Sequence, residues 1–523
     1  MLPTAFVYDH TSSEPLYRQL SAHLAALIRS GAFSKTDRLP SVRDLAGFAD
    51  VSRNTAAAAY ALLEAQGYVS AKSRSGFRTA TPNDFVFPQT DRAPFVYPAA
   101  PDAAAAAVLD ISTGTPEGTA AAERAAAAVL RKLYRAVLAD PDTDIYLKRG
   151  DPSGEPQLRR ALARYLSDRR GVVCSEDQIL IGAGTEYVLQ TAVRILQART
   201  GRQSIYAVEE PGSDTIRKIF DDALTPAESE FSADQHGRTV GIPVDGNGIS
   251  VDLLGSSGAD IVCVTPAHQF PTGSSMNLER KAELLRWAYK TPNRYIIEDS
   301  YDSDYYYAAA QPAALQSMDS QGRVLYFGTF AQMTVPSMQT AYLVLPPQLV
   351  HLFRRQFSYY SCTVPLLEQR AVTAFLKDGH AEKLAARARK FNRQRRAFCT
   401  AQFEREMPGA VIIGGKTGTH FLVELPEPVN AERFAEQLRR NGITAQLVQT
   451  VRNAAGQPQT VAAGQPQITE KPQSEGQTQT EGQTQTVAFI VKYPFLTEDE
   501  CRFAARTAAA VYLQTRSTIP LEE

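Results

Sequence analysis

Residues 324–339 read Val-Leu-Tyr-Phe-Gly-Thr-Phe-Ala-Gln-Met-Thr-Val-Pro-Ser-Met-Gln, an apolar run followed by a turn of small and polar residues. The run predicts a buried strand, and an α/β protein places such a turn above the carboxyl edge of its sheet, where ligands bind. The turn offers Thr, Gln and Ser side chains but no Lys, His or Cys. The segment therefore marks a candidate site that lacks the side chains expected of a nucleophile or base.

The whole chain has the composition of a multidomain globular protein. It contains 523 residues, too many for one hydrophobic core, and 44% of them are apolar and 21% charged. The formal net charge is −1, so any nucleic-acid site must be a local basic patch. Five scattered cysteines without metal-ligand spacing indicate a reducing compartment, and no signal peptide or membrane-spanning run is evident. We expect a cytoplasmic protein with no membrane partner and no metal site.

Residues 1–80 predict a winged helix-turn-helix, a mainly α domain that binds DNA. Apolar spacing indicates three helices, of which the second begins at Ser41 and the third at Ser52, and a hairpin of two short strands follows Gly67. The segment carries nine Lys and Arg residues against six Asp and Glu, a net charge of +3. Its basic residues gather at helix starts and at the hairpin tip, where they could meet phosphates.

Candidate contacts with double-stranded DNA follow from this arrangement. The start of a recognition helix reaches base edges, where Arg53 suits guanine and Asn54 suits adenine. Ser41, Arg43 and Arg74 are better placed for the DNA backbone or minor groove. The alternative is a small helical domain with a solvated basic edge. The predicted set is Arg38, Ser41, Arg43, Ser52, Arg53, Asn54, Thr55, Arg74 and Gly76.

The same segment resembles the GntR family of bacterial regulators. The resemblance implies a transcription regulator. It is carried by Pro15-Leu16-Tyr17, by residues 38–46 (Arg-Leu-Pro-Ser-Val-Arg-Asp-Leu-Ala), by residues 51–55 (Val-Ser-Arg-Asn-Thr), and by Gly67-Tyr68-Val69 ahead of Ser75-Gly76.

The remaining chain divides by composition into a linker, a large domain and a smaller lobe. Proline density sets residues 81–108 apart as an extended linker, either laid on a surface or a disordered tether. Residues 109–350 alternate helical stretches with short apolar runs, which predicts an α/β domain with a mostly parallel sheet. Residues 351–523 predict an α+β lobe. Within it, the low-complexity segment 452–486 has too few apolar residues to fold, so we expect a disordered insert.

The large domain resembles the fold-type-I aminotransferases and, together with the N-terminal domain, the MocR subfamily of GntR regulators. The resemblance implies pyridoxal phosphate held on a lysine, a role in sensing small amines or the cofactor itself, and a homodimer, commonly head-to-tail. It is carried by Tyr146-Leu147, Gly150 to Gly154, Gly182 to Tyr187, Glu210-Pro211-Gly212, Thr265 to Gly273, Glu298 to Ser303 and Gly328-Thr329-Phe330.

The resemblance also assigns roles within the pocket. Asp299 would pair with the pyridine nitrogen, Tyr301 would lie near the phenolic oxygen, and His268 and Gln269 would contact the ring. Backbone N–H groups of residues 184–186 would face the phosphate. The alternative for these side chains is a relict polar cluster, bonded internally. The predicted pocket comprises Gly184, Thr185, Glu186, Ser213, His268, Gln269, Asp299, Tyr301, Gln332 and Gln339.

Three positions depart from the family pattern. The Schiff-base lysine falls at Gln332, the phosphate-clamping arginine at Gln339 and a ring-contacting tyrosine at Ser213. An amide nitrogen is not nucleophilic, so Gln332 cannot carry the cofactor, and residues 323–347 contain no lysine. Loss of the clamp would weaken phosphate binding by roughly 1.5–3 kcal/mol.

We therefore expect a dimeric DNA-binding transcription regulator whose aminotransferase-like domain is catalytically inactive. It would hold no covalent cofactor, but pyridoxal phosphate or a related small ligand could bind non-covalently as an effector of unknown identity. Two alternatives remain: a pyridoxal-phosphate-dependent transaminase with an accessory DNA-binding domain, and a purely structural large domain without a ligand.

Overall fold

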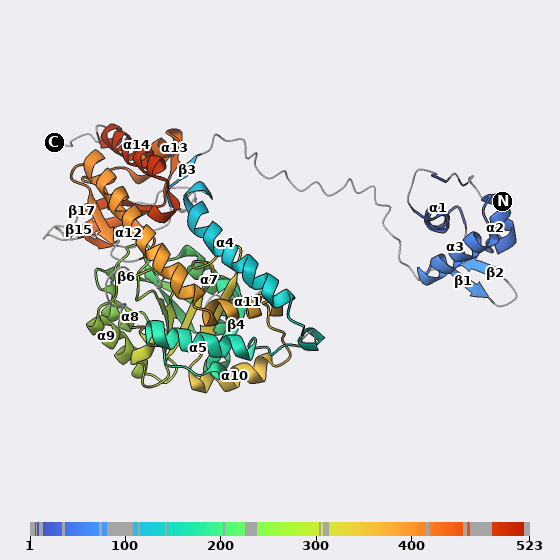
Figure 1. Ribbon diagram of the computed structural model, residues 1–523, viewed down its shortest axis with the longest axis horizontal. Helices are drawn as coiled ribbons and strands as arrows, with labels where there is room; N and C mark the ends of the chain where they lie inside the picture. Colours follow the sequence, from blue (N-terminus) through green and yellow to red (C-terminus); the bar gives the residue numbers. More distant parts are fainter. Residues whose placement is uncertain are drawn as a thin grey trace, which may run out of the picture. The chain divides into compact units, whose positions relative to one another are not determined.

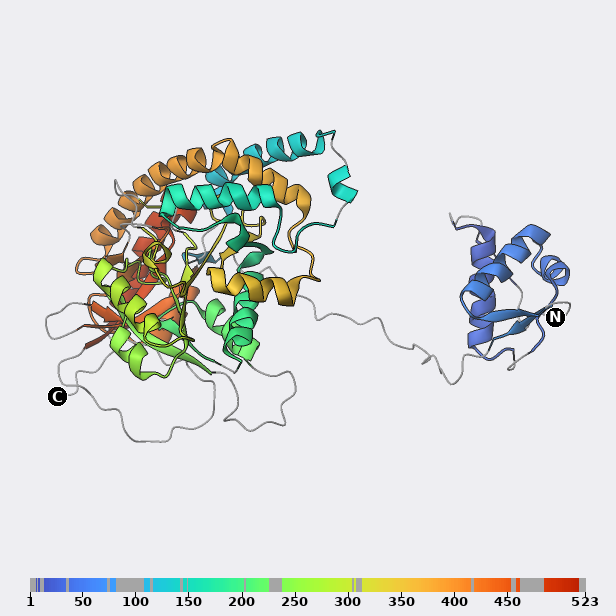
Figure 2. The ribbon, with the colours of Figure 1, turned by 90° about the horizontal axis from the view of Figure 1, so that it is seen from below.

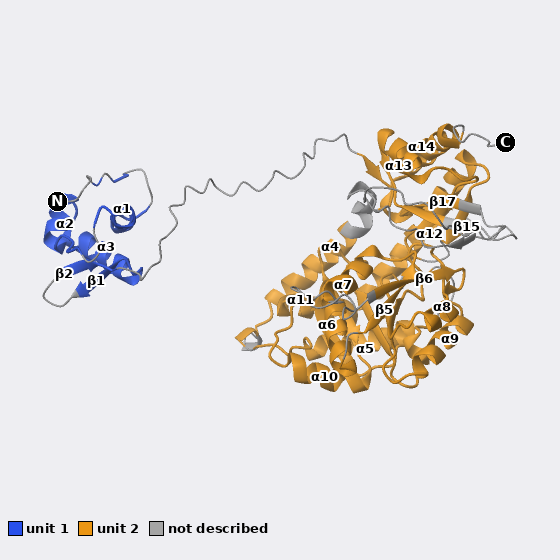
Figure 3. Ribbon diagram, turned by 180° about the vertical axis from the view of Figure 1, so that it is seen from behind, with its two compact units in different colours: residues 1–103 blue, residues 104–523 orange. Residues whose placement is uncertain are grey.

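The structure is a computed structural model of the chain (Figure 1). It forms two compact units, residues 1–103 and 104–523, coloured separately in Figure 3, and each is described by itself. No helix of the described part of the chain is both long and apolar enough to cross a membrane. The described residues are 6, 8–9, 14–33, 37–72, 76–80, 108–112, 116–141, 144–147, 149–201, 204–224, 238–302, 305–306, 313–414, 418–452, 458–460 and 484–516.

The first unit is a winged helix-turn-helix, as expected. Apolar side chains from all three helices share one core, and Tyr60 stacks on Phe77 with ring centroids 4.2 Å apart. The Tyr60 hydroxyl donates to the carbonyl of Pro40 over 2.7 Å, which ties the third helix to the start of the second. The elements are α1 (Leu16–Arg29), α2 (Val42–Phe48), α3 (Arg53–Ala65), β1 (Val69–Lys72) and β2 (Gly76–Thr79).

The second unit is built on an eight-stranded sheet. Its five central strands run parallel, and antiparallel strands close both edges. This confirms the mostly parallel sheet predicted for the large domain. The strand order is β4 (Ile179–Ala183), β11 (Thr340–Val344), β10 (Val324–Thr329), β9 (Tyr295–Asp299), β8 (Ile261–Val264), β5 (Ile205–Glu210), β6 (Arg238–Asp245) and β7 (Gly248–Ile249).

Helices cover both faces of this sheet, giving three layers (Figure 2). Alternate residues of a strand point to opposite faces, so Leu325 and Phe327 join one core while Tyr326 joins another. The first face is covered by α6 (Gly184–Thr200), α7 (Asp214–Leu224) and α10 (Pro347–Phe357). The opposite face is covered by α4 (Pro116–Leu138), α5 (Pro156–Arg170), α8 (Val251–Ser256), α9 (Leu278–Tyr289) and α11 (Leu366–Lys377).

The smaller lobe is an α+β layer around a five-stranded antiparallel sheet. Its long helix α12 (His380–Glu406) begins in the core of the large domain, at Ala381, and ends in the core of the lobe, at Phe403. Strand order is β12 (Val411–Gly414), β13 (Phe421–Glu424), β17 (Thr484–Val491), β15 (Leu447–Arg452) and β16 (Pro458–Thr460). Helices α13 (Ala431–Arg440) and α14 (Glu498–Arg516) and the pair β3 (Leu109–Asp110) and β14 (Ile443–Thr444) complete it.

The structure differs from the expected division at residues 109 and 350. Leu109 and Ile111 lie in the core of the small lobe, whereas α10 and α11 pack on the large domain. α11 and α12 are separate helices, because Gly379 between them takes a left-handed conformation with φ of +68°. Each of these segments belongs to the domain against which its apolar face is buried, whatever its place in the chain.

The low-complexity insert is also partly ordered. Residues 458–460 form β16, and residues 484–486 begin β17, where they pair with β15. The expectation of a disordered loop is wrong for these ends, since backbone pairing to an existing strand orders them without apolar side chains. Residues 461–483, like the linker residues 81–107, lie outside the described part of the chain.

Candidate functional site

A cavity of about 290 Å³ lies between the carboxyl edge of the large sheet and the small lobe. Its floor comes from the ends of β5, β8, β9 and β10, and its roof from residues 419–420, Lys492 and Phe495 of the lobe. The lining side chains include Thr185, Glu186, Glu209, Ser213, Phe270, Asp299, Tyr301, Gln332, Thr419, His420 and Lys492. Ligands of doubly wound sheets bind at this edge, so the cavity is the candidate site.

Strand register brings the floor residues together. Asp299 ends β9 directly beside Phe327 of β10, and Val264 of β8 pairs with the neighbouring Glu298. Glu209 follows Val208, which pairs with Cys263 of β8. Parallel strands end at one edge, so two carboxylates far apart in the sequence meet in one cavity.

Gln332 lines the cavity, one turn beyond the end of β10. Its backbone carbonyl accepts a hydrogen bond from the Tyr305 hydroxyl, which fixes the turn. Gln339 does not line this cavity but a neighbouring one of about 530 Å³, which shares Gln332 and Lys492. The Gln339 amide donates to the Pro336 carbonyl over 2.7 Å. The Gln339 side chain therefore offers no charge to a ligand, and one of its amide N–H groups is already used in a hydrogen bond within its own loop.

The expected phosphate cradle at the start of α6 is partly filled. The Gly184 N–H donates to the backbone carbonyl of Gln339 over 2.5 Å. A Cβ placed on Gly184, where φ is +89°, would lie 2.8 Å from Oε2 of Glu186 and 3.6 Å from Oε1 of Gln339. Oxygen atoms of Glu186 and Gln339 thus lie around Gly184. A bound phosphate would need N–H donors there instead. Thr185 and Glu186 line the cavity, but Gly184 does not.

The floor carries two buried acids. Burial raises the pKa of Glu209 to about 7, although hydrogen bonds from Thr265 and Gln269 oppose the shift. Burial, with repulsion from Asp302 and Glu209, raises the pKa of Asp299 well above its usual range. Oε1 of Glu209 and Oδ1 of Asp299 are buried without a hydrogen-bond partner among the described residues. Such atoms are costly unless a donor reaches them.

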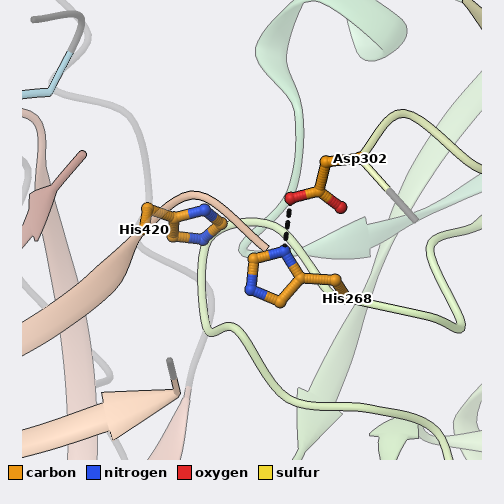
Figure 4. Close-up of side chains that lie close together, drawn as sticks. All are labelled: His268, Asp302 and His420. Atoms are coloured by element: carbon orange, nitrogen blue, oxygen red, sulfur yellow. Dashed lines mark hydrogen bonds and ion pairs between the residues drawn. The ribbon is translucent and has the colours of Figure 1, made fainter. Parts of the chain in front are cut away.

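A cluster of His268, Asp302 and His420 joins floor and roof (Figure 4). Oδ2 of Asp302 lies 2.7 Å from Nδ1 of His268, and the Tyr301 hydroxyl lies 2.9 Å from the same nitrogen. Nε2 of His420 lies 3.0 Å from the Pro271 carbonyl. Burial lowers the pKa of His420 well below its usual range, so this imidazole is neutral. The cluster brings one ligand atom from each side chain within 4.8 Å of the others.

Gly418 makes the approach of floor and roof geometrically feasible. A Cβ at this position would lie 2.0 Å from Cε1 of His268 and 2.6 Å from Oδ2 of Asp302, and φ is +75°. No L-residue fits such a backbone and such a gap without moving the cluster.

Two of the predicted ring contacts lie behind the cavity wall rather than on it. His268 and Gln269 are buried and are not among the cavity-lining residues. Gln269 braces the loop instead: its Oε1 accepts from the Thr272 N–H over 3.0 Å, and its Nε2 donates to the Pro211 carbonyl over 2.9 Å. Phe270, which the sequence analysis did not select, lines the cavity in their place. Ser213 and Tyr301 also line the cavity.

Lys492 was not predicted and supplies the cavity's only lysine side chain among the described residues. It leaves β17 immediately after Val491, on the roof. Burial lowers its pKa, while Asp110 and Asp302 oppose the shift. Its amine has no hydrogen-bond or ion-pair partner in the described part of the chain. Alternation along β17 could have suggested that Lys492 faces inward, but not what it faces.

We expect Glu209→Gln to stabilise the protein increasingly as pH rises from 5 to 8. The folded chain keeps a proton on Glu209 up to about pH 7, whereas the unfolded chain releases it near 4.3. The free energy of unfolding of the wild type therefore falls by about 3 kcal/mol as pH rises from about 4.3 to about 7. The variant has no carboxyl group at this position and does not show this fall. Urea unfolding of both proteins across the pH range measures the difference. Glu432→Gln, at an exposed site on α13, is the control. If the stability of Glu209→Gln depended on pH in the same way as that of the wild type, Glu209 would not be a buried acid with a raised pKa.

In the first unit, the predicted DNA contacts gather at two helix starts. Ser52 caps α3 by accepting from the Thr55 N–H over 3.0 Å, and Ser41 caps α2 by accepting from the Asp44 N–H over 3.1 Å. Arg53 and Asn54 are exposed in the first turn of α3. Arg38, Arg43 and Gly76 are exposed as well, and Arg74 lies outside the described residues. A capped helix with a free first turn can enter a major groove.

Both units match known families. Residues 16–78 match the family described as bacterial regulatory proteins, gntR family, and residues 106–453 match aminotransferase class I and II. The uncharacterized HTH-type transcriptional regulator YdeL of Bacillus subtilis is 30% identical over 90% of this chain and 96% of its own length. The probable rhizopine catabolism regulatory protein MocR of Rhizobium meliloti is 30% identical over 77% of this chain and 80% of its own length. The chain belongs to the MocR-type GntR regulators.

Solved structures bear on the fold of this MocR-type regulator. The kynurenine aminotransferase of Pyrococcus horikoshii superposes with a TM-score of 0.60 at 19% identity, over 78% of this chain and 92% of the enzyme. At that identity the likeness shows a fold-type-I aminotransferase architecture and nothing of the chemistry. The chemistry of the MocR-type cavity has to be argued from its own residues.

Proposed function

We propose that this MocR-type regulator controls transcription by binding double-stranded DNA as a homodimer, and that its aminotransferase-like domain senses a small effector without catalysing transamination. One observation carries the proposal: the turn after β10 presents Gln332 to the cavity, where covalent cofactor chemistry needs an amine. The exposed, capped start of α3 supports the DNA-binding part.

The residues present do not fit pyridoxal phosphate as a covalent cofactor. Gln332 has no nucleophilic nitrogen, Gln339 has no charge, and Glu186 places a carboxylate oxygen close to Gly184. Asp299, which would pair with a ring nitrogen, and Tyr301 do line the cavity. Non-covalent binding of a related small ligand remains compatible with the cavity, and a dissociable ligand is what a sensor requires.

An exposed apolar patch supports the homodimer. Leu138, Tyr146, Leu147 and Tyr359 are large and exposed, with Leu147 at 83%. They are held near one another, because the Tyr146 hydroxyl donates to the Val137 carbonyl and Arg149 donates to the Tyr359 carbonyl. Apolar surface of this kind marks an interaction site, and a second copy of the chain, head-to-tail or otherwise, would cover it.

A transaminase is the second candidate function, and Lys492 is the observation that favours it. We expect borohydride treatment of the protein with pyridoxal phosphate, followed by peptide mapping, to label Lys492 no more than an exposed lysine such as Lys377. The reason is geometric: Lys492 lies on the roof of the cavity, whereas the turn after β10, where a cofactor-binding lysine is expected, carries Gln332. Strong labelling that disappears in Lys492→Ala would contradict this and restore the enzyme.

A further inference from the structure

The floor of the cavity lacks hydrogen-bond donors for its own acids. On the floor, Oε1 of Glu209 and Oδ1 of Asp299 are buried without a partner among the described residues. On the roof the same holds for Nδ1 of His420, and all three side chains line the cavity. Glu209 and Asp299 are only 5% and 7% exposed, so bulk water does not compensate them. A ligand that brings N–H donors would satisfy atoms that the protein leaves unsatisfied.

The phosphate end of the cavity has the wrong polarity for an anion. Glu186 supplies a carboxylate oxygen close to Gly184, and the backbone carbonyl of Gln339 already takes the Gly184 N–H. The Gln339 side chain is neutral and bonded to Pro336. A phosphate placed there would meet a like charge instead of a guanidinium, which costs free energy rather than gaining it.

The roof has the opposite character to the floor. Lys492 lines the cavity there, together with Thr419 and His420. Burial lowers the pKa of its amine, while the charges of Asp110 and Asp302 oppose that shift, and the amine has no direct ion pair among the described residues. Between floor and roof the wall is apolar, built from Val208, Ile216, Val264, Phe270, Phe327 and Phe495.

We propose that the cavity binds a small phosphate-free zwitterion in the place of a phosphorylated cofactor. Its cationic nitrogen lies toward Asp299 and Glu209, its apolar middle lies along Phe270, and its carboxylate faces Lys492. This inference rests on the sensor role proposed above and names the chemical class of the effector. It explains why the pocket keeps Asp299 while the residues that would hold phosphate are gone.

Binding to the full-length protein tests the proposal with simple probes. The meta and para isomers of (aminomethyl)benzoate carry a cationic nitrogen and a carboxylate at two different spacings. Benzylamine lacks the carboxylate, benzoate lacks the cationic nitrogen, and pyridoxal phosphate carries a phosphate instead of a carboxylate. We expect calorimetry to give the better isomer an affinity about tenfold above benzylamine and benzoate, the worth of one added charged contact. Pyridoxal phosphate should bind more weakly than that isomer. Glu186→Gln should reduce this difference in affinity, because it removes a negative charge near the phosphate.

Three variants assign the two ends of the ligand. Lys492→Met should remove the advantage of the zwitterion over benzylamine, while Lys377→Met, at an exposed position, should leave it intact. Asp299→Asn should weaken the zwitterion and benzylamine about equally and leave benzoate unchanged; its unchanged circular dichroism would show that it folds.

Several results would overturn the proposal: tighter binding of pyridoxal phosphate than of either isomer, no binding of either isomer, or an unchanged zwitterion preference in Lys492→Met. Promoter DNA binding, measured on the same preparation without probes, tests the proposed function separately. A protein that binds its promoter but none of the zwitterions would retain the function and lose this inference.

Discussion

Gln332→Lys combined with Gln339→Arg is expected to convert a protein that forms no stable adduct with pyridoxal phosphate into one that is labelled at residue 332. The turn after β10 already directs residue 332 into the cavity, and Asp299 already lies at the floor. A lysine there supplies the missing nucleophile, and an arginine adds a charged contact worth roughly 1.5–3 kcal/mol, or about 10- to 100-fold in affinity. Visible absorbance and borohydride-trapped peptide mapping measure the change.

A matched control separates the site from the residue type. Gln190→Lys adds a lysine at an exposed position of α6, outside the cavity lining, and should give no specific label. The single variant Gln332→Lys should be labelled less completely than the double variant, because Gln339 offers no charge to the phosphate. Equal spectra from wild type and the double variant would contradict the interpretation of a site degenerate at two positions.

Arg53→Ala combined with Asn54→Ala is expected to abolish the preference of the protein for its operator. Each base contact made from the start of a recognition helix is worth about 1–3 kcal/mol, so losing two should cost about 100-fold or more. Alanine is a good helix former and Ser52 still caps α3, so the domain should remain folded. Fluorescence anisotropy with operator and scrambled duplexes measures both the affinity and the preference.

Arg29→Ala is the charge-matched control for that pair. Arg29 lies in the last turn of α1, and its loss removes one positive charge without touching α3. It should weaken binding to both duplexes by a few-fold at most and leave their ratio unchanged. If Arg53→Ala with Asn54→Ala behaved like this control, α3 would not be the helix that reads the bases.

Local sequence signals were sufficient to predict the helices of the first unit. Ser41 and Ser52 are good N-caps, and their side chains do cap α2 and α3. Short apolar runs were sufficient to predict the mostly parallel sheet, because buried strands such as Ile261–Val264 are short, apolar and β-branched. β6, whose sequence Arg-Thr-Val-Gly-Ile-Pro-Val-Asp mixes polar residues with Gly and Pro, was missed. It is a strand because β5 offers it a paired edge, which is a tertiary effect.

Long-range packing limited the prediction of the cavity. The resemblance to the aminotransferases selected Asp299, but it did not select the two residues that give the cavity its polarity. Glu209 matters because β5 and β9 end at one edge, and Lys492 matters because the small lobe folds over that edge. Likewise, His268 was expected at the ring, yet its bond to Asp302 holds it behind the wall. These outcomes depend on contacts between residues tens to hundreds of positions apart, which periodicity and spacing do not encode.

A regulator of this kind should act on DNA and not on a substrate of transamination. The decisive measurement is competition binding of the full-length protein to the DNA upstream of its own gene, against a scrambled duplex at moderate salt. We predict saturable binding that prefers the upstream DNA by at least about 1,000-fold, the range of specific regulators. Equal affinity for both duplexes, or no binding to either, would contradict the account.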